Sequence, residues 1–161
     1  MATVTFGSFP RSGNFFLLEI FRKNASSVGV HWTEHNVDLL VKAKNPFTVM
    51  RNPLECVPSW IVHQNDTRPN RAEKTLEWYC SFYQKCFDKN IKIFNFDYLI
   101  NDPIGLISNF CNVQVLETNF KYFYNETKDK SNYESILKEI YIAESFNKAK
   151  ELFDKLCVHV G

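Results

Sequence analysis

The chain has 161 residues, of which 45% are hydrophobic and 23% are charged. These fractions exclude intrinsically disordered and collagen-like classes, and they predict a single domain spanning residues 1–161. The formal net charge of +1 excludes the strong basic field that attracts nucleic acid, so any anionic ligand must be held by a local site.

The expected cellular location and the state of the cysteines are inferred from the absence of three sequence signals: a signal peptide, a membrane span and paired cysteines. Residues 1–6 have neither the basic start nor the long apolar run of a signal peptide, and no stretch reaches the length of a membrane span. The cysteines do not pair at the two-residue spacing of zinc or redox motifs; they are Cys56, Cys80, Cys86, Cys111 and Cys157. We therefore expect a soluble, cytoplasmic protein with reduced, buried thiols, no metal site, and neither a membrane nor a nucleic-acid partner.

Predicted strands and helices alternate along the chain. Runs rich in β-branched and aromatic residues predict strands at 3–6, 28–32, 47–50 and 91–96. Helical spacing and start signals predict helices from Asn14, which can serve as N-cap, then over 37–43, from Pro53 to about 64, over 71–90, over 103–111, and one or two between 133 and 157. This alternation predicts an α/β fold, a three-layer α/β/α sandwich around a parallel sheet of about four strands, with ligands at the carboxyl ends of the strands.

The loop after the first predicted strand has the composition of an anion-binding turn. The segment from Gly7 to Asn14 places a flexible backbone, a cation and a hydroxyl at the start of a helix. Backbone amides and the positive end of the helix dipole favour an anion at such a turn. A nucleoside-triphosphate loop would need a lysine and then a serine or threonine after its last glycine, and Asn14 and Phe15 occupy those places. ATP or GTP hydrolysis is therefore disfavoured.

A second pattern follows the third predicted strand. Arg51 ends the strand, Asn52 and Pro53 start a helix, and Ser59 comes eight residues after the arginine. About two helical turns can bring the Ser59 hydroxyl to the side of the guanidinium, which can hold phosphate in a bidentate grip. The alternative is that Arg51 pairs with a carboxylate such as Glu55 and that Ser59 only packs.

Taken in order, these segments resemble the sulfotransferase family. The loop matches the family's 5′-phosphosulfate motif at Pro10, Arg11, Ser12, Gly13, Asn14 and Phe16, while Phe15 takes the place of its usual threonine. Arg51 and Ser59 resemble the family's 3′-phosphate motif, and Phe96 stands for the tyrosine that commonly opens its third segment. The resemblance implies a P-loop sulfotransferase-like fold.

The same resemblance implies a cosubstrate and its binding residues. The cosubstrate would be 3′-phosphoadenosine 5′-phosphosulfate, with adenosine 3′,5′-bisphosphate as product and no metal. The residues implied to bind it are Pro10, Arg11, Ser12, Gly13, Asn14, Phe15, Arg51, Ser59 and Phe96. The other partner would be an unidentified acceptor with a hydroxyl or amine group.

Two catalytic roles can be assigned to residues near the strand ends. Arg11 would stabilise charge on the transferred sulfuryl group and, because a guanidinium stays protonated, would not act as an acid. His35, in the loop after the second predicted strand, is the preferred base, since a histidine titrates near neutrality. Glu34 and His31 remain alternatives.

Two other functions stay open. A noncatalytic nucleotide-binding module is favoured by Phe15 and by the short chain. A P-loop phosphotransferase on the same sheet is disfavoured because the lysine and the magnesium-binding hydroxyl are missing.

Overall fold

The computed structural model describes residues 2–24, 28–110 and 132–157. Its four strands form one parallel sheet in the order β2-β1-β3-β4. They are β1 (Ala2–Phe6), β2 (Val28–Trp32), β3 (Pro46–Met50) and β4 (Lys92–Asn95). The predicted α/β class and the four-stranded parallel sheet are thus confirmed.

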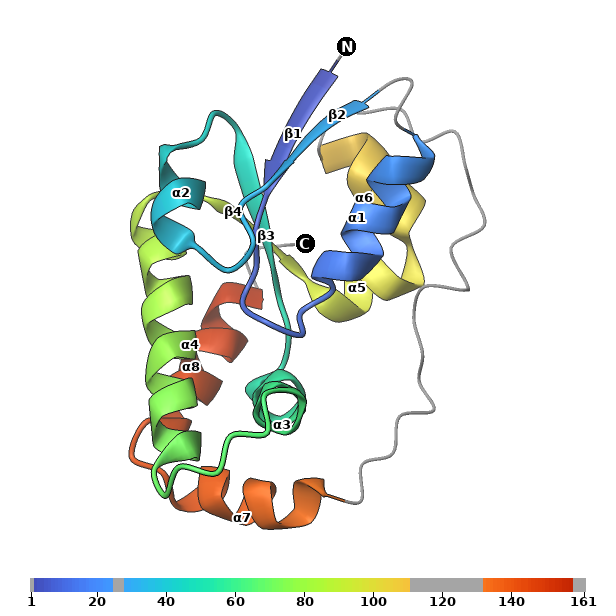
Figure 1. The fold of residues 1–161 in the computed structure, drawn as a ribbon. Helices are drawn as coiled ribbons and strands as arrows, with labels where there is room; N and C mark the ends of the chain where they lie inside the picture. Colours follow the sequence, from blue (N-terminus) through green and yellow to red (C-terminus); the bar gives the residue numbers. More distant parts are fainter. Residues whose placement is uncertain (1, 25–27, 111–131, 158–161) are drawn as a thin grey trace.

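Helices cover both faces of the sheet (Figure 1). One face carries α1 (Asn14–Lys23), α5 (Phe96–Asn101) and α6 (Pro103–Phe110). The other face carries α2 (Val37–Lys42), α4 (Arg71–Asp88) and α8 (Phe146–Cys157), and α3 (Pro53–His63) and α7 (Tyr133–Ile142) extend this layer beyond the carboxyl ends of the strands. The arrangement is consistent with the predicted α/β/α layers.

Side-chain alternation in the strands divides the core into two clusters. Val49 and Phe94 pack in the cluster beneath α1, whereas their neighbours Met50 and Ile93 pack in the cluster beneath α4. Successive side chains of a strand point to opposite faces, so a mostly apolar strand such as β3 can serve both layers.

Several element boundaries differ from the sequence prediction by one or two residues. The strand predicted over 91–96 ends at Asn95, because the Asn95 side chain accepts a hydrogen bond from the Asp97 amide (2.8 Å) and starts α5 at Phe96. The N-cap of α1 is Gly13, and Asn14, predicted as the cap, is instead the first helical residue. The helix predicted over 37–43 ends at Lys42.

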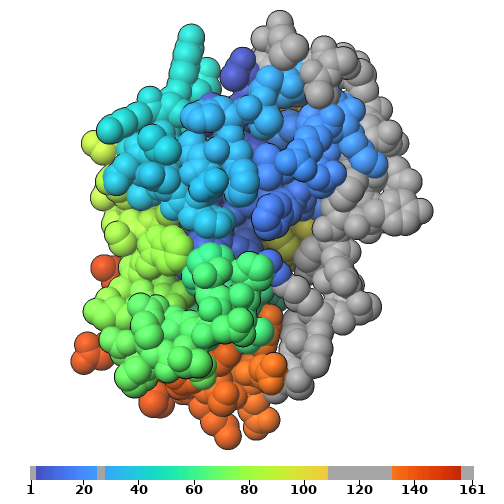
Figure 2. Space-filling view, in the orientation of Figure 1, coloured from blue at the N-terminus to red at the C-terminus, as the bar shows by residue number. Residues whose placement is uncertain are grey.

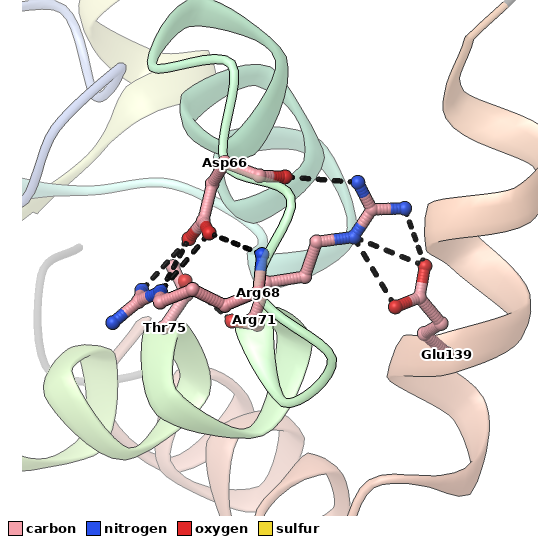
Figure 3. A network of polar contacts seen from close by, with 5 residues as sticks. All are labelled: Asp66, Arg68, Arg71, Thr75 and Glu139. Carbon is pink, nitrogen blue, oxygen red and sulfur yellow. Dashed lines mark hydrogen bonds and ion pairs between the residues drawn. The ribbon is translucent and has the colours of Figure 1, made fainter.

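A network of arginines and carboxylates holds α7 against the connection between α3 and α4 (Figure 3). Arg71 donates to the Glu139 carboxylate from Nη2 (2.7 Å) and from Nε (3.2 Å), and its Nη1 donates to the Asp66 carbonyl (2.9 Å). Arg68 forms a fork with the Asp66 carboxylate, and the Thr75 hydroxyl donates to the Arg71 carbonyl. These bonds hold the middle of α7, at Glu139, against the first residue of α4.

The cysteines and the helix lengths bear on two further predictions. Cys56, Cys80 and Cys86 are buried and free, as expected, whereas Cys111 and the side chain of Cys157 lie outside the described residues. Among the described helices, none combines the length and the apolar character that crossing a bilayer requires.

Candidate anion site

The strand order creates a crevice at the carboxyl end of β1. The chain passes from β1 to β2 on one side and returns to β3 on the other, so the connections after β1 and β3 leave toward opposite faces. Ligands of open parallel sheets bind at such a switch point. The loop at residues 7–13 and the pair Arg51–Asn52 follow these two strands.

The loop is fastened to the sheet through Ser8. The Ser8 hydroxyl, which is buried, accepts hydrogen bonds from the Val49 amide (2.8 Å) and from the Thr48 hydroxyl (3.3 Å). The Ser8 carbonyl accepts from Asn14 Nδ2 (3.2 Å), which ties the loop to the start of α1. The loop therefore has a fixed shape.

Glycine is required at two points of this loop. Gly13 has φ = 92°, and a Cβ there would lie 3.2 Å from the Phe96 ring. A Cβ at Gly7 would lie 2.0 Å from Thr33 Oγ1, where β2 ends beside β1. Arg11 also has positive φ (63°), an uncommon conformation for a residue with a Cβ. Left-handed residues in turns help form the concave backbone that binds anions, and strain of this kind concentrates at functional sites.

Two guanidinium groups and a hydroxyl meet at this loop. Arg11 Nε donates to the Ser59 hydroxyl (2.9 Å), and Arg51 Nη1 donates to the Arg11 carbonyl (3.0 Å). The Arg51 guanidinium also lies over the Phe96 ring, 4.3 Å from its centroid. The structure thus brings together Arg11, Arg51 and Ser59. The ion pair between Arg51 and Glu55, which the sequence offered as an alternative, is also present: Arg51 Nε lies 3.3 Å from the Glu55 carboxylate.

The site holds more positive charge than its described surroundings neutralise. Burial lowers the pKa of Arg11; Tyr133 raises it, and the nearby Arg51 lowers it further. Arg11 has no carboxylate partner among the described residues, and the first turn of α1 contains no acidic residue. The two guanidinium groups carry like charges, and a bound anion would relieve their repulsion.

Two buried polar atoms of the loop have no hydrogen bond of good geometry among the described residues, Ser12 Oγ and Asn14 Oδ1. Ser12 Oγ lies close to the Cys56 thiol and the Tyr83 hydroxyl and interacts weakly with both. A buried hydroxyl without a good hydrogen bond is unfavourable and is uncommon in folded proteins. The Ser12 hydroxyl is therefore a donor that a ligand oxygen could satisfy.

His35 is attached to the same loop. Its Nδ1 lies 2.9 Å from the Ser8 carbonyl, which can only accept, so Nδ1 carries the proton and Nε2 is the basic nitrogen. The ring lies close to all three tryptophans of the chain, with centroid distances of 6.3 Å to Trp32, 5.7 Å to Trp60 and 6.5 Å to Trp78. The sequence did not predict that these tryptophans surround His35, because they are far apart along the chain and belong to no recognisable motif.

His35 and Arg11 approach neighbouring residues of one helix. Trp60, against the His35 ring, follows Ser59, which accepts from Arg11. His31 and Glu34 are exposed and make no hydrogen bond to the loop within the described residues. Of the three candidate bases, His35 is the one with a hydrogen bond to the loop.

The remaining predicted binding residues lie at the edge of the site or beneath it. Phe15 is 66% exposed, and its ring centroid lies 5.8 Å from that of Trp32. Pro10 is buried within the loop. Phe96 is buried and supports Arg51 through its ring face, so its observed contact is with a cation of the site.

No metal-binding group of three or more histidine, cysteine or acidic side chains occurs within the described ranges.

A scan against protein-family models, a search of curated proteins and a search of solved structures each find no match to this chain.

Proposed function

We propose that this protein is a sulfotransferase that moves a sulfuryl group from 3′-phosphoadenosine 5′-phosphosulfate to an acceptor hydroxyl or amine. The observation that carries the proposal is the meeting of Arg11, Arg51 and Ser59 at one loop, through the bonds of Arg11 Nε to Ser59 and of Arg51 Nη1 to the Arg11 carbonyl. The two segments that resemble the family's phosphate motifs supply these cations and hydroxyls, Arg11 and Ser12 in the first and Arg51 and Ser59 in the second. A nucleotide with phosphate groups at both its 3′ and 5′ positions has the charge and the oxygen acceptors that such a site lacks.

The site residues divide between two phosphate positions. Arg51 and Ser59 would hold the 3′-phosphate, and Ser12 with the amides at the start of α1 would hold the 5′-phosphosulfate. Pro10 and Gly13 shape the loop that presents these amides. When bound, the cosubstrate supplies the sulfuryl group as an electrophile. Arg11 would neutralise negative charge that develops on its oxygens in the transition state.

His35 would act on the acceptor. Its Nδ1 is held by the Ser8 carbonyl, which orients the ring and leaves Nε2 to take the proton of the attacking hydroxyl or amine. The tryptophans around the ring limit its motion and partly exclude water from it. Glu34 and His31 remain alternative bases, and both are more exposed.

A noncatalytic nucleotide-binding module is the second candidate, and a specific observation favours it. Phe15 projects an exposed ring where the resembled family has a threonine hydroxyl for the 5′-phosphate. Incubation with sulfur-labelled cosubstrate and a broad panel of hydroxyl and amine acceptors separates the two candidates. Nucleotide binding without any transfer of label would favour the module.

The nucleotide assignment is tested by removing the charge of Arg51. Arg51→Gln should weaken adenosine 3′,5′-bisphosphate binding by about 10- to 100-fold, the loss expected for a charge-assisted hydrogen bond, measured by titration calorimetry. Binding of adenosine 5′-monophosphate, which lacks the 3′-phosphate, should change far less. Arg68→Gln, which removes a charge paired with Asp66 outside the site, is the control. Equal losses for both nucleotides would contradict the assignment of Arg51.

A further inference from the structure

The donors of Arg51 are already partly engaged. A guanidinium presents two parallel N–H groups along either of two edges, Nε with Nη2 or Nη1 with Nη2. In Arg51, Nε lies 3.3 Å from Glu55 Oε2 and Nη1 donates to the Arg11 carbonyl (3.0 Å). Nη2 donates to no residue that the structure describes. The single N–H of Nε is thus in use, so a bidentate grip on phosphate along the edge of Nε and Nη2 needs the contact with Glu55 to break.

The two contacts differ in how readily they can break. The Arg11 carbonyl belongs to a loop residue at φ = 63°, and the loop is fastened to β3 through Ser8. Glu55 is a side chain that is 45% exposed, while Arg51 is 15% exposed. An ion pair with one partner in water is weak, and a carboxylate on the first turn of α3 can rotate into solvent without moving the backbone.

The ring of Phe96 keeps Arg51 in place during such an exchange. The guanidinium lies 4.3 Å above the ring centroid and keeps its bond to the Arg11 carbonyl when Glu55 leaves. The edge formed by Nε and Nη2 then becomes available as a unit.

We infer that Glu55 is a displaceable counter-ion of Arg51: it occupies the edge formed by Nε and Nη2 in the free protein, and the phosphate of a bound nucleotide displaces it from that edge. The inference rests on the proposed function, because it takes the 3′-phosphate as the group that reaches Arg51. Glu55 thereby sets the affinity and the selectivity of the site. A ligand with a dianionic phosphate at this position replaces the carboxylate, whereas a ligand without one leaves the pair intact.

The test compares Glu55→Gln with the unmodified protein. Glutamine keeps the shape of the side chain and removes the charge that competes with phosphate. We expect the dissociation constant for adenosine 3′,5′-bisphosphate to fall by about two- to five-fold, the range of an exposed ion pair. Adenosine 5′-monophosphate should bind both proteins with nearly equal affinity. Glu77→Gln, which removes a similarly exposed carboxylate paired with Lys74 on α4, should affect neither nucleotide.

The possible outcomes distinguish failure of this inference from failure of the proposed function. Tight bisphosphate binding by the unmodified protein with no gain in Glu55→Gln would overturn the inference alone. An equal gain in affinity for both nucleotides would also overturn it. Such a gain would reflect a general change in the electrostatic potential of the site and not the displacement of Glu55 by a 3′-phosphate. Failure of both proteins to bind the bisphosphate would contradict the proposed function and the inference together. Thermal unfolding of the variants checks that each is folded.

Discussion

Two buried serines of one loop differ in their hydrogen bonding. The Ser8 hydroxyl accepts from the Val49 amide and the Thr48 hydroxyl, whereas Ser12 Oγ has no hydrogen bond of good geometry among the described residues and lies only close to Cys56 and Tyr83. The first serine is therefore expected to serve the fold and the second to serve the ligand. Retaining a buried hydroxyl without a good hydrogen bond is understandable where a ligand completes its hydrogen bonds.

Alanine substitutions at these serines test the division. Ser8→Ala should lower the free energy of unfolding by about 1–3 kcal/mol, because it strands the buried Val49 amide. Ser12→Ala should leave that free energy unchanged or raise it, and should weaken adenosine 3′,5′-bisphosphate binding. Urea denaturation and titration calorimetry measure the two quantities. A Ser12→Ala variant that is as unstable as Ser8→Ala and binds the nucleotide normally would contradict this assignment.

The sequence pattern identified the two arginines of the site but predicted less well which residues contact the site residues. Arg11 and Arg51 could be singled out because each follows a predicted strand, and the structure brings them together. The contact of Ser59 with Arg11, at a separation of 48 residues, was not predictable, since the sequence pattern paired Ser59 with Arg51. The aromatic setting of His35 depends on three distant tryptophans and could not be inferred from periodicity.

The start of α3 positions the second half of the site. Asn52 caps this helix by accepting from the Leu54 amide (2.9 Å), with Arg51 just before the cap and Ser59 within the helix. Because one cap orients both residues, its loss should disturb binding as well as stability.

Asn52→Ala should lower the free energy of unfolding by about 1 kcal/mol and should also weaken bisphosphate binding. Asn36→Ala is the matched control, since Asn36 caps α2 through the Leu39 amide (3.1 Å) and should cost similar stability without changing affinity. Denaturant titration and calorimetry on both variants provide the comparison. Equal losses of affinity would indicate general loosening of the fold, against a specific role for the start of α3.

Helices and strands could be predicted where local signals agree. Pro53 at a helix start and the apolar periodicity of 71–90 predicted α3 and α4 to within two residues at each end. α5 was not predicted: Phe96 continues the apolar run of β4, and the Asn95 cap, which starts the helix there, outweighs that pattern. At α1, the left-handed conformation of Gly13 decides where the helix begins.

The architecture as a whole depends on pairings that no local pattern contains. Alternation of elements predicts a parallel sheet with helices on both faces, but it does not give the order β2-β1-β3-β4. That order places β1 beside β3, so that Arg51 reaches the Arg11 carbonyl across 40 residues of chain. In the space-filling view, the blue and cyan residues of the first three strands and of α1 and α2 lie above the green segments of α3 and α4 and the orange segment of α7 (Figure 2). The proposed site requires both parts, since the loop after β1 supplies Arg11 and α3 supplies Ser59.

Thermal unfolding with adenosine 3′,5′-bisphosphate, in the absence of magnesium, tests the central claim most directly. A ligand at one hundred times its dissociation constant should stabilise the folded protein by about 2.7 kcal/mol, which raises the midpoint by about 5–10 °C for a chain of this size. The proposed site predicts this rise with the bisphosphate and a smaller one with adenosine 5′-monophosphate at the same concentration. A rise with ATP and magnesium, and none with the bisphosphate, would contradict it.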